Sequence, residues 1–195
     1  MPLLVNDRVD VALAVGADGV HLGQQDMSVP MARRLLGPGA IVGLTVERWE
    51  DVEEAQDLEV DYLGVSPVFA TANKTDTKGA WGLQGLARIR AYSRHPLVAI
   101  GGLNAANIAD VVRAGADGIA VVSAICGAAE PQQAAVDLVR RMRAGCEQPP
   151  PGQVDEGMPQ MLRDRVATAS SRPPTGTRLY TLRCRRSHRR SRNPW

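Results

Sequence analysis

The hydrophobic pattern of the chain is periodic, because short apolar runs alternate with segments of helical periodicity through about residue 142. This pattern predicts strands at 3–5, 19–22, 41–44, 62–65, 97–100 and 119–122. It predicts helices at 7–15, 28–36, 47–58, 83–93, 104–114 and 131–142. The predicted strands are continuously apolar, which is typical of parallel strands covered on both faces. The pattern therefore predicts six consecutive strand–helix units in an α/β fold.

A similar five-residue sequence joins a helix to the next strand at three places: GADGV at 16–20, EVDYL at 59–63 and GADGI at 115–119. Two of the three begin with glycine, which often ends a helix in the left-handed backbone conformation. The spacing between the copies is not constant. We therefore interpret the sequence as a recurring junction and not as the repeat of a solenoid.

The distribution of polar residues favours a barrel over an open, doubly wound sheet. Polar residues cluster after the carboxyl ends of the predicted strands, as at Asn6, Gln24, Thr45, Lys74 and Ser123. In a barrel these positions meet at one face, where such enzymes place their active sites. We therefore predict an incomplete (β/α)8 TIM barrel over residues 1–145, with six units visible and the first two missing.

Residues 146–195 differ in composition, being rich in proline and arginine. Residues 1–145 contain 13 Lys+Arg and 17 Asp+Glu, a net charge of −4, whereas residues 146–195 contain 10 and 4, a net charge of +6. A nucleic-acid-binding arm is one interpretation of the basic tail. No aromatic or glycine pattern accompanies the arginines, so we expect a disordered tail and no nucleic-acid partner.

The chain shows no apolar run long enough to span a bilayer, and its first residues do not resemble a secretory leader. We therefore expect a cytoplasmic protein without a membrane partner. The three histidines, His21, His95 and His188, lie far apart, so a histidine-based zinc site is not expected.

The segment after the fourth predicted strand carries the most suggestive chemistry. It contains Thr71, Asn73 and Lys74, so a buried strand leads into a loop with one lysine among hydroxyls and an amide. The lysine supplies a positive charge and its neighbours supply neutral hydrogen-bond donors, which together suit an anionic ligand. A solvated loop with a surface lysine is the simpler alternative.

Two carboxylates stand at neighbouring strand ends. Asn6 and Asp7 end the first predicted strand, and Asp26 follows the second. Such a pair, beside an amide, suits a Mg2+ ion that keeps several waters and binds a substrate phosphate. Alternatively, Asp7 caps its helix and Asp26 lies on a surface loop.

The last two predicted strands end in a second set of anion-binding candidates. Gly101 and Gly102 follow one strand and Ser123 follows the other, which matches the usual phosphate site of a TIM barrel. A tight turn would also use two glycines. Taken with Lys74, these positions predict an enzyme for two phosphorylated substrates, or for one substrate with two phosphate ends.

Several motifs in order resemble the thiamine phosphate synthase family. They are NDR at 6–8, GVHLGQQD at 19–26, GVSPVFAT at 64–71 with Lys74, IGG at 100–102 and VVSAI at 121–125. The resemblance covers about residues 3–143. It implies a TIM barrel that joins the diphosphate of 4-amino-2-methyl-5-hydroxymethylpyrimidine (HMP diphosphate) to thiazole phosphate, giving thiamine phosphate and pyrophosphate.

The resemblance also implies roles for individual residues. Asp7 and Asp26 would bind Mg2+, Asn6 would contact the pyrimidine substrate, and Lys74 would contact its diphosphate. The thiazole phosphate region would be held by Thr71, Asn73, Gly102, Val122 and Ser123. Thr45 stands where the family usually has serine, and Asn73 stands where a second threonine is usual. The dissociative mechanism of the family needs no protein nucleophile, which agrees with the lack of a Ser/His/Asp or Cys/His set.

The chain departs from the family at its start, because a Gln-x-x-x-Lys segment that usually precedes Asn6 is absent from this sequence. An open barrel has unpaired strand edges, so low solubility or homo-oligomerisation is expected. Two alternatives to the synthase remain: a thiazole tautomerase or regulatory homologue on the same barrel, and an inactive truncated remnant. The tautomerase group carries a histidine before the Val-Phe segment, where this chain has Ser66 and Pro67.

Overall fold

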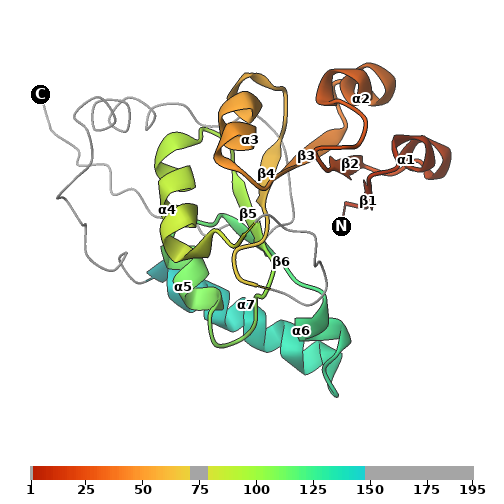
Figure 1. The fold of residues 1–195 in the computed structure, drawn as a ribbon. Helices are drawn as coiled ribbons and strands as arrows, with labels where there is room; N and C mark the ends of the chain where they lie inside the picture. Colours follow the sequence, from red (N-terminus) through yellow and green to blue (C-terminus); the bar gives the residue numbers. More distant parts are fainter. Residues whose placement is uncertain (1, 71–78, 148–195) are drawn as a thin grey trace, which may run out of the picture.

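The computed structural model describes residues 2–70 and 79–147. Within them, six parallel strands form one sheet in chain order: β1 (Leu4–Asn6), β2 (Gly19–Leu22), β3 (Ile41–Val46), β4 (Tyr62–Val65), β5 (Leu97–Ile100) and β6 (Gly118–Ala120). The described chain is therefore a TIM-barrel-like half-barrel, which confirms the predicted parallel α/β fold (Figure 1). Thr71, Asn73, Lys74 and the tail from residue 148 on lie outside the described residues.

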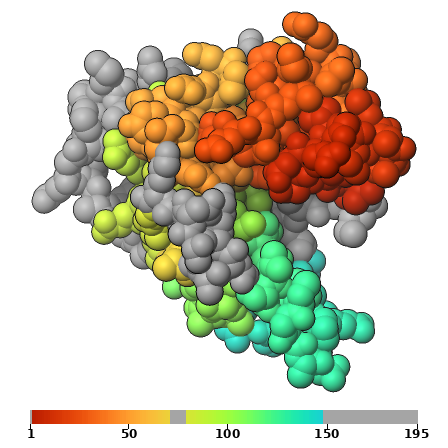
Figure 2. Space-filling view, turned by 45° about the vertical axis from the view of Figure 1, so that its right-hand side comes forward, coloured from red at the N-terminus to blue at the C-terminus, as the bar shows by residue number. Residues whose placement is uncertain are grey.

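Helices follow the strands as predicted. They are α1 (Val9–Val15), α2 (Val29–Leu36), α3 (Trp49–Glu54) with the 3-10 helix η1 (Ala55–Asp57), α4 (Gly82–Tyr92), α5 (Ile108–Arg113), α6 (Ser123–Cys126) and α7 (Pro131–Glu147). The short helix α6 was not predicted, because four residues are too few to show a helical period. In Figure 2 this segment projects from the body of the molecule. The longest helix, α7, continues past the predicted end at residue 142 and packs against α5.

Helix boundaries follow the capping residues only in part. Gly16 ends α1 in left-handed backbone with φ 63°, as the glycine of the recurring junction predicted. Ser28 is the N-cap of α2 and Pro30 lies in its first turn, but the serine side chain makes no capping hydrogen bond. The predicted cap Asn104 is not the N-cap of α5, which is Asn107. Asn104 instead accepts a hydrogen bond from the backbone N–H of Ala106 in the preceding turn, at 2.8 Å.

The hydrophobic core lies between the sheet and its helices. From the sheet, Val20, Val42, Leu63 and Leu97 pack into this core, and from the helices Val9, Val52, Leu86, Ile89 and Val111 do so. Successive side chains of a strand point to opposite faces. Accordingly, Leu97 and Ala99 in β5 are buried, whereas the alternating Val98 and Ile100 are less so. The face of β5 toward the helices is therefore the more deeply buried of the two.

The recurring junction has a structural explanation, since each aspartate pins the start of a neighbouring strand. The carboxylate of Asp18 accepts a hydrogen bond from the backbone N–H of Leu3 at 2.6 Å. Asp61 does the same for Val42 at 2.8 Å, and Asp117 for Leu97 at 2.8 Å. All three lie at the amino ends of the strands, the opposite end from the predicted site.

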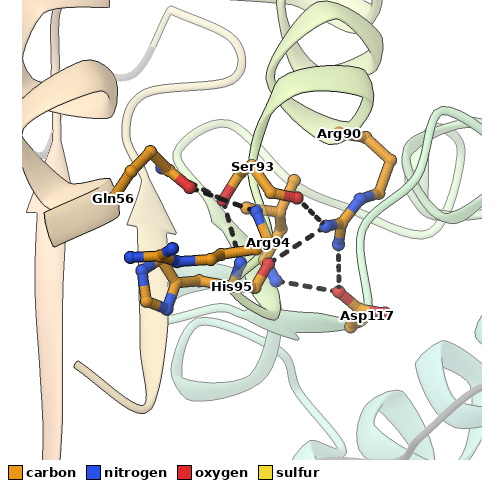
Figure 3. Close-up of polar contacts among 7 residues, drawn as sticks. Gln56, Arg90, Ser93, Arg94, His95 and Asp117 are labelled. Atoms are coloured by element: carbon orange, nitrogen blue, oxygen red, sulfur yellow. Dashed lines mark hydrogen bonds and ion pairs between the residues drawn. The ribbon is translucent and has the colours of Figure 1, made fainter. Parts of the chain in front are cut away.

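An arginine reinforces two of these three junctions. Arg33 of α2 pairs with Asp61 at 2.7 Å, and Arg90 of α4 pairs with Asp117 at 2.8 Å. Figure 3 shows Arg90 between Asp117 and the turn after α4, where its guanidinium also donates to the carbonyl oxygens of Ser93 and His95. The arginines thus tie the end of a helix to the start of a strand, a structural role.

Within the described ranges, none of the helices combines the length and the apolar character that crossing a membrane requires.

Candidate functional site

The strand register places the predicted polar residues of β1 and β3 on one face of the sheet. Asn6 of β1 is in register with His21 of β2, which is in register with Gly43 of β3. Gly43 is in register in turn with Tyr62 of β4. Thr45 lies two residues after Gly43 and therefore shares its face. This face is opposite the one that packs against the helices, because the alternating neighbours Val20, Val42 and Leu63 belong to the core.

Asn6 and Asp7 lie at the carboxyl end of β1, at one edge of the site. The Nδ2 of Asn6 donates a hydrogen bond to Oδ1 of Asp7 at 2.8 Å, and the backbone N–H of Asp7 donates to the carbonyl oxygen of His21 at 2.8 Å. Asp7 is the sole non-glycine residue with positive φ, 63°, in the described part of the chain. Aspartate tolerates this conformation better than most residues, and such outliers gather at functional sites. The N-cap of α1 is Arg8, so Asp7 does not occupy the capping position.

Asp26 is held at the end of β2 by the turn that follows this strand. Its Oδ2 accepts a hydrogen bond from the backbone N–H of Gly23 at 2.6 Å. The carboxylate lies close enough to His21 to favour the protonated imidazole, although burial has the larger effect and lowers the pKa of His21 overall. Both Asp7 and Asp26 are exposed, so each carboxylate is accessible to a ligand from solvent.

The side chain of His21 joins β2 to both following strands. Its Nδ1 lies 2.9 Å from the hydroxyl oxygen of Tyr62, and its Nε2 lies 2.7 Å from Oγ1 of Thr45. The rings of His21 and Tyr62 stack with a centroid distance of 5.4 Å and an interplanar angle of 17°. Burial raises the pKa of Tyr62 to about 12. Both rings are therefore neutral at neutral pH, and their polar atoms face each other and Thr45.

Two glycines make room for this ring pair. A Cβ atom on Gly43 would lie 2.1 Å from Cζ of Tyr62, and one on Gly64 would lie 2.8 Å from Cε1 of His21. Neither glycine has positive φ, so the requirement comes from space and not from backbone conformation. Any larger side chain at these positions would displace a ring, so the space for the two rings depends on glycine at both positions.

Thr45 is fixed from two sides. The Nε2 atom of Gln24 donates to its carbonyl oxygen at 2.6 Å, while His21 contacts its hydroxyl. The strand β3 runs to Val46, two residues past its predicted end, so Thr45 lies within the sheet and not in a loop. The hydroxyl is therefore held by regular strand geometry, and it is only partly buried.

The segment that leads into residues 71–78 is anchored beside the end of β5. The backbone N–H of Val68 donates to the carbonyl oxygen of Ile100 at 2.8 Å, and that of Phe69 donates to Gly101 at 3.1 Å. Gly101 and Gly102 have φ of 96° and 65°. A Cβ on Gly102 would lie 2.7 Å from Cβ of Phe69. Close packing against this segment and positive φ together explain why two glycines stand here.

Val122 and Ser123 occupy the far side of the half-barrel, after β6. Val122 is the N-cap of α6 and Ser123 is its first residue. Both residues are exposed. Like Gly102, they follow the carboxyl end of a strand, as the sequence predicted. However, β3, β4 and β5 lie between β6, which they follow, and the strands β1 and β2, which end near Asn6 and Asp26.

Sequence reasoning missed His21 and Tyr62 as members of the site, although it placed Gln24 among the polar residues at the strand ends. His21 was considered only as a zinc ligand, and Tyr62 only as the start of an apolar strand. Their link to Thr45 depends on register between strands, which the sequence does not give. One signal in the sequence could have found them. His21 and Tyr62 place polar ring atoms in otherwise apolar strands, and the neighbouring strands contain a glycine, Gly43 or Gly64, that leaves space for a ring.

The comparisons with known proteins agree with one another. The sequence model of a family described as thiamine monophosphate synthase matches residues 1–125. A thiamine-phosphate synthase of Albidiferax ferrireducens is 58% identical over 138 residues, which cover 71% of this chain and 63% of that protein. One from Vibrio campbellii is 51% identical over 143 residues, which cover 73% of this chain and 70% of that protein.

A solved structure extends the likeness to the fold. The thiamine phosphate pyrophosphorylase of Pyrococcus furiosus superposes with a TM-score of 0.67 at 42% identity, covering 73% of this chain and 67% of that one. The chain thus spans 63% of the length of the Albidiferax relative, which is less than two thirds. It spans 70% of the Vibrio relative and 67% of the Pyrococcus chain. On its matching sequence model, its close relatives and its fold, the chain belongs to the thiamine monophosphate synthase family.

Proposed function

We propose that this chain is a thiamine phosphate synthase, a transferase that condenses HMP diphosphate with thiazole phosphate in thiamine biosynthesis. The observation that supports this most is the alignment of Asn6, His21 and Thr45 on one face of a half-barrel, at strand ends of a chain from this family. The face offers amide, hydroxyl and carboxylate groups, which suit a reaction driven by stabilising a leaving group.

The residues present fit a Mg2+ ion. Asp7 and Asp26 supply hard carboxylate oxygens from two adjacent strand ends, and Asn6 holds one oxygen of Asp7 in place. The described residues contain no group of three or more His, Cys, Asp or Glu that could enclose a metal. Two carboxylates without a full protein cage suit an ion that keeps waters and also binds substrate phosphate. When bound, Mg2+ would neutralise charge on the diphosphate.

The remaining roles follow the family resemblance. Asn6 would contact the pyrimidine and Lys74 its diphosphate, and Thr45 keeps the hydroxyl of the serine that the family usually has at this position. Thr71, Asn73, Gly102, Val122 and Ser123 would hold the thiazole phosphate. Gly102 has its backbone in the left-handed region, with φ 65°, so its peptide groups can approach an anion closely without a side chain in the way.

The proposed reaction needs only substitution at one carbon. The bond between the pyrimidine methylene carbon and the diphosphate oxygen breaks, and its electron pair leaves with pyrophosphate. The lone pair of the thiazole nitrogen then forms the new carbon–nitrogen bond. The tasks of the protein are to hold the departing charge, through Lys74 and the hydroxyl of Thr45, and to align the two rings.

The test is thiamine phosphate formation by the purified chain, supplied with both substrates and Mg2+. We expect product from the wild type and a loss of about 100-fold or more in Lys74→Ala, because a charge-assisted contact to the leaving group is removed. Lys78→Ala, which removes a lysine from the same segment, is the matched control and should retain activity. Asp7→Asn should raise the Mg2+ concentration needed for half-maximal rate.

No product from a chain that folds cooperatively would overturn the proposal. That outcome would favour the inactive remnant, whereas turnover of the thiazole substrate alone would favour the tautomerase. In the tautomerase group a histidine precedes the Val-Phe segment, and the buried Ser66 stands there in this chain. This residue therefore supports the synthase over the tautomerase.

A further inference from the structure

His21 lies within hydrogen-bond distance of two hydroxyl groups, those of Tyr62 and Thr45, and these contacts hold the three side chains in place. The contacts also bear on which group donates each hydrogen bond, since a hydroxyl can donate or accept and a neutral imidazole does one at each nitrogen. That direction decides what the hydroxyl of Thr45 can offer to a ligand. Only the identity of that ligand rests on the proposed function.

Tyr62 sets the direction of the first hydrogen bond. Its side chain is buried, with 6% exposure, and its hydroxyl lies 2.9 Å from Nδ1 of His21. No other hydrogen bond to this hydroxyl is present among the described residues, and no buried side-chain polar atom there lacks a partner. If Nδ1 donated, the hydroxyl hydrogen of Tyr62 would be buried without an acceptor, which is costly. The hydroxyl therefore donates and Nδ1 accepts.

The direction of the second hydrogen bond follows from the first. A neutral imidazole whose Nδ1 accepts carries its hydrogen on Nε2. This nitrogen lies 2.7 Å from Oγ1 of Thr45 and must donate to it. The hydroxyl of Thr45 then accepts from His21, and its own hydrogen remains for another acceptor. Thr45 is only partly buried, on the same face as Asn6.

We propose that Tyr62 and His21 are positioning residues that make Thr45 a dedicated hydrogen-bond donor to the site. The group that Thr45 recognises is then one that only accepts, and the oxygens of the substrate diphosphate fit this requirement. Thr45 in turn contacts the ligand, whereas His21 and Tyr62 act through it. The glycines at 43 and 64, which leave space for the two rings, keep the pair in the orientation that this direction of bonding needs.

The tautomer of His21 can be measured without any substrate. Nitrogen-15 chemical shifts in long-range proton–nitrogen spectra show which ring nitrogen carries hydrogen, and His21→Gln identifies the signal. His95 provides an internal reference, because its Nε2 lies 3.0 Å from the carbonyl oxygen of Ala55, which can only accept. We expect hydrogen on Nε2 of both histidines at neutral pH. Hydrogen on Nδ1 of His21, or on both nitrogens, would overturn the proposal.

The second measurement is calorimetric binding of inorganic pyrophosphate, with and without Mg2+, to the wild type and three variants. Tyr62→Phe keeps the ring but removes the donor, so the imidazole can accept from Thr45 instead. We expect pyrophosphate to bind about tenfold more weakly to Tyr62→Phe and at least as much more weakly to Thr45→Val. Thr45→Ser, which retains a hydroxyl, should bind like the wild type.

Tyr92→Phe is the matched control, because Tyr92 packs against Trp49 and makes no contact with His21. Thermal unfolding of each variant checks that it is folded. Equal pyrophosphate affinity in Tyr62→Phe and the wild type would overturn the positioning role. A wild type that shows hydrogen on Nε2 of His21 but never binds pyrophosphate would instead count against the diphosphate as the ligand, and with it against the proposed function.

Discussion

Asp117 and Leu97 exchange two hydrogen bonds at the amino end of the sheet. The backbone N–H of Asp117 donates to the carbonyl oxygen of Leu97 at 2.8 Å, and the carboxylate of Asp117 accepts from the N–H of Leu97 at 2.8 Å. Asp61 with Val42 and Asp18 with Leu3 repeat this arrangement. The recurring aspartate of the sequence therefore links the amino ends of two neighbouring strands by a pair of hydrogen bonds.

Replacing these aspartates should destabilise the fold in a definite order. Asp61→Ala should cost about 2–3 kcal/mol, because the N–H of Val42 loses its side-chain acceptor and the mostly buried guanidinium of Arg33 loses its carboxylate partner. Asp117→Ala should cost less, since Arg90 and Asp117 are more exposed. Asp18→Ala should cost least, about 1 kcal/mol, because only the exposed Leu3 N–H is affected. Urea unfolding measures all three free energies.

The control for this series is Asp10→Ala. Asp10 forms an exposed ion pair with Arg8, and its loss should leave the free energy of unfolding unchanged within error. If Asp10→Ala lowered the free energy of unfolding as much as Asp61→Ala, a general loss of charge would explain the effect, and not the loss of the hydrogen bonds between the strand ends.

Gly43→Ala should destabilise the protein, because the new Cβ would lie 2.1 Å from Cζ of the buried Tyr62 ring. Overpacking of this kind costs about 1–3 kcal/mol. Gly39→Ala is the control, since a Cβ there has no heavy atom within 4 Å. In a double-mutant cycle, Gly43→Ala should be far less harmful when Tyr62 is alanine. Additive costs would show that Gly43 is not there to make room for Tyr62.

Thr45→Val should lower kcat/KM of the proposed synthase by about 10- to 100-fold, because a hydroxyl that hydrogen-bonds a charged group is replaced by a methyl of similar shape. Thr45→Ser should stay within about threefold of the wild type, since it keeps the donor. Steady-state kinetics with HMP diphosphate as the varied substrate provide the test. Equal rates in the valine and serine variants would exclude a role for the hydroxyl.

The stability of the fold should fall as pH drops below about 6.5. Burial lowers the pKa of His21 and of His95 from their usual value of 6.5. The unfolded chain therefore binds more protons than the native chain below that pH, so the free energy of unfolding rises with pH in this window and levels off above it. Urea unfolding between pH 5 and 7.5 should show this slope, and the His21→Gln variant should show a smaller one. A flat profile would contradict neutral imidazoles at the partly buried His21 and His95.

The sequence predicted the order of elements well because each strand–helix unit carries its own signals. Apolar runs marked all six strands, and the bounds of β2, β4 and β5 agree with those observed. β3 runs two residues past its predicted end, because Thr45 and Val46 continue its pairing with β4. β6 ends two residues before its predicted end, and Val122 is already the N-cap of α6. The sequence also placed Asp7 and Asp26 after strand ends, where they lie, whereas Asn6 is the last residue of β1 itself.

What the sequence by itself determined is therefore local: the helix and strand order, the strand-end position of the polar residues and the family motifs. Only the tertiary structure decided which residues touch. The link from Tyr62 through His21 to Thr45 depends on strand register, and the purpose of Gly43 and Gly64 is visible only once two rings occupy the space above them. The physical reason is that apolar periodicity encodes which face of an element is buried, whereas contacts between side chains of different strands depend on packing across the whole sheet.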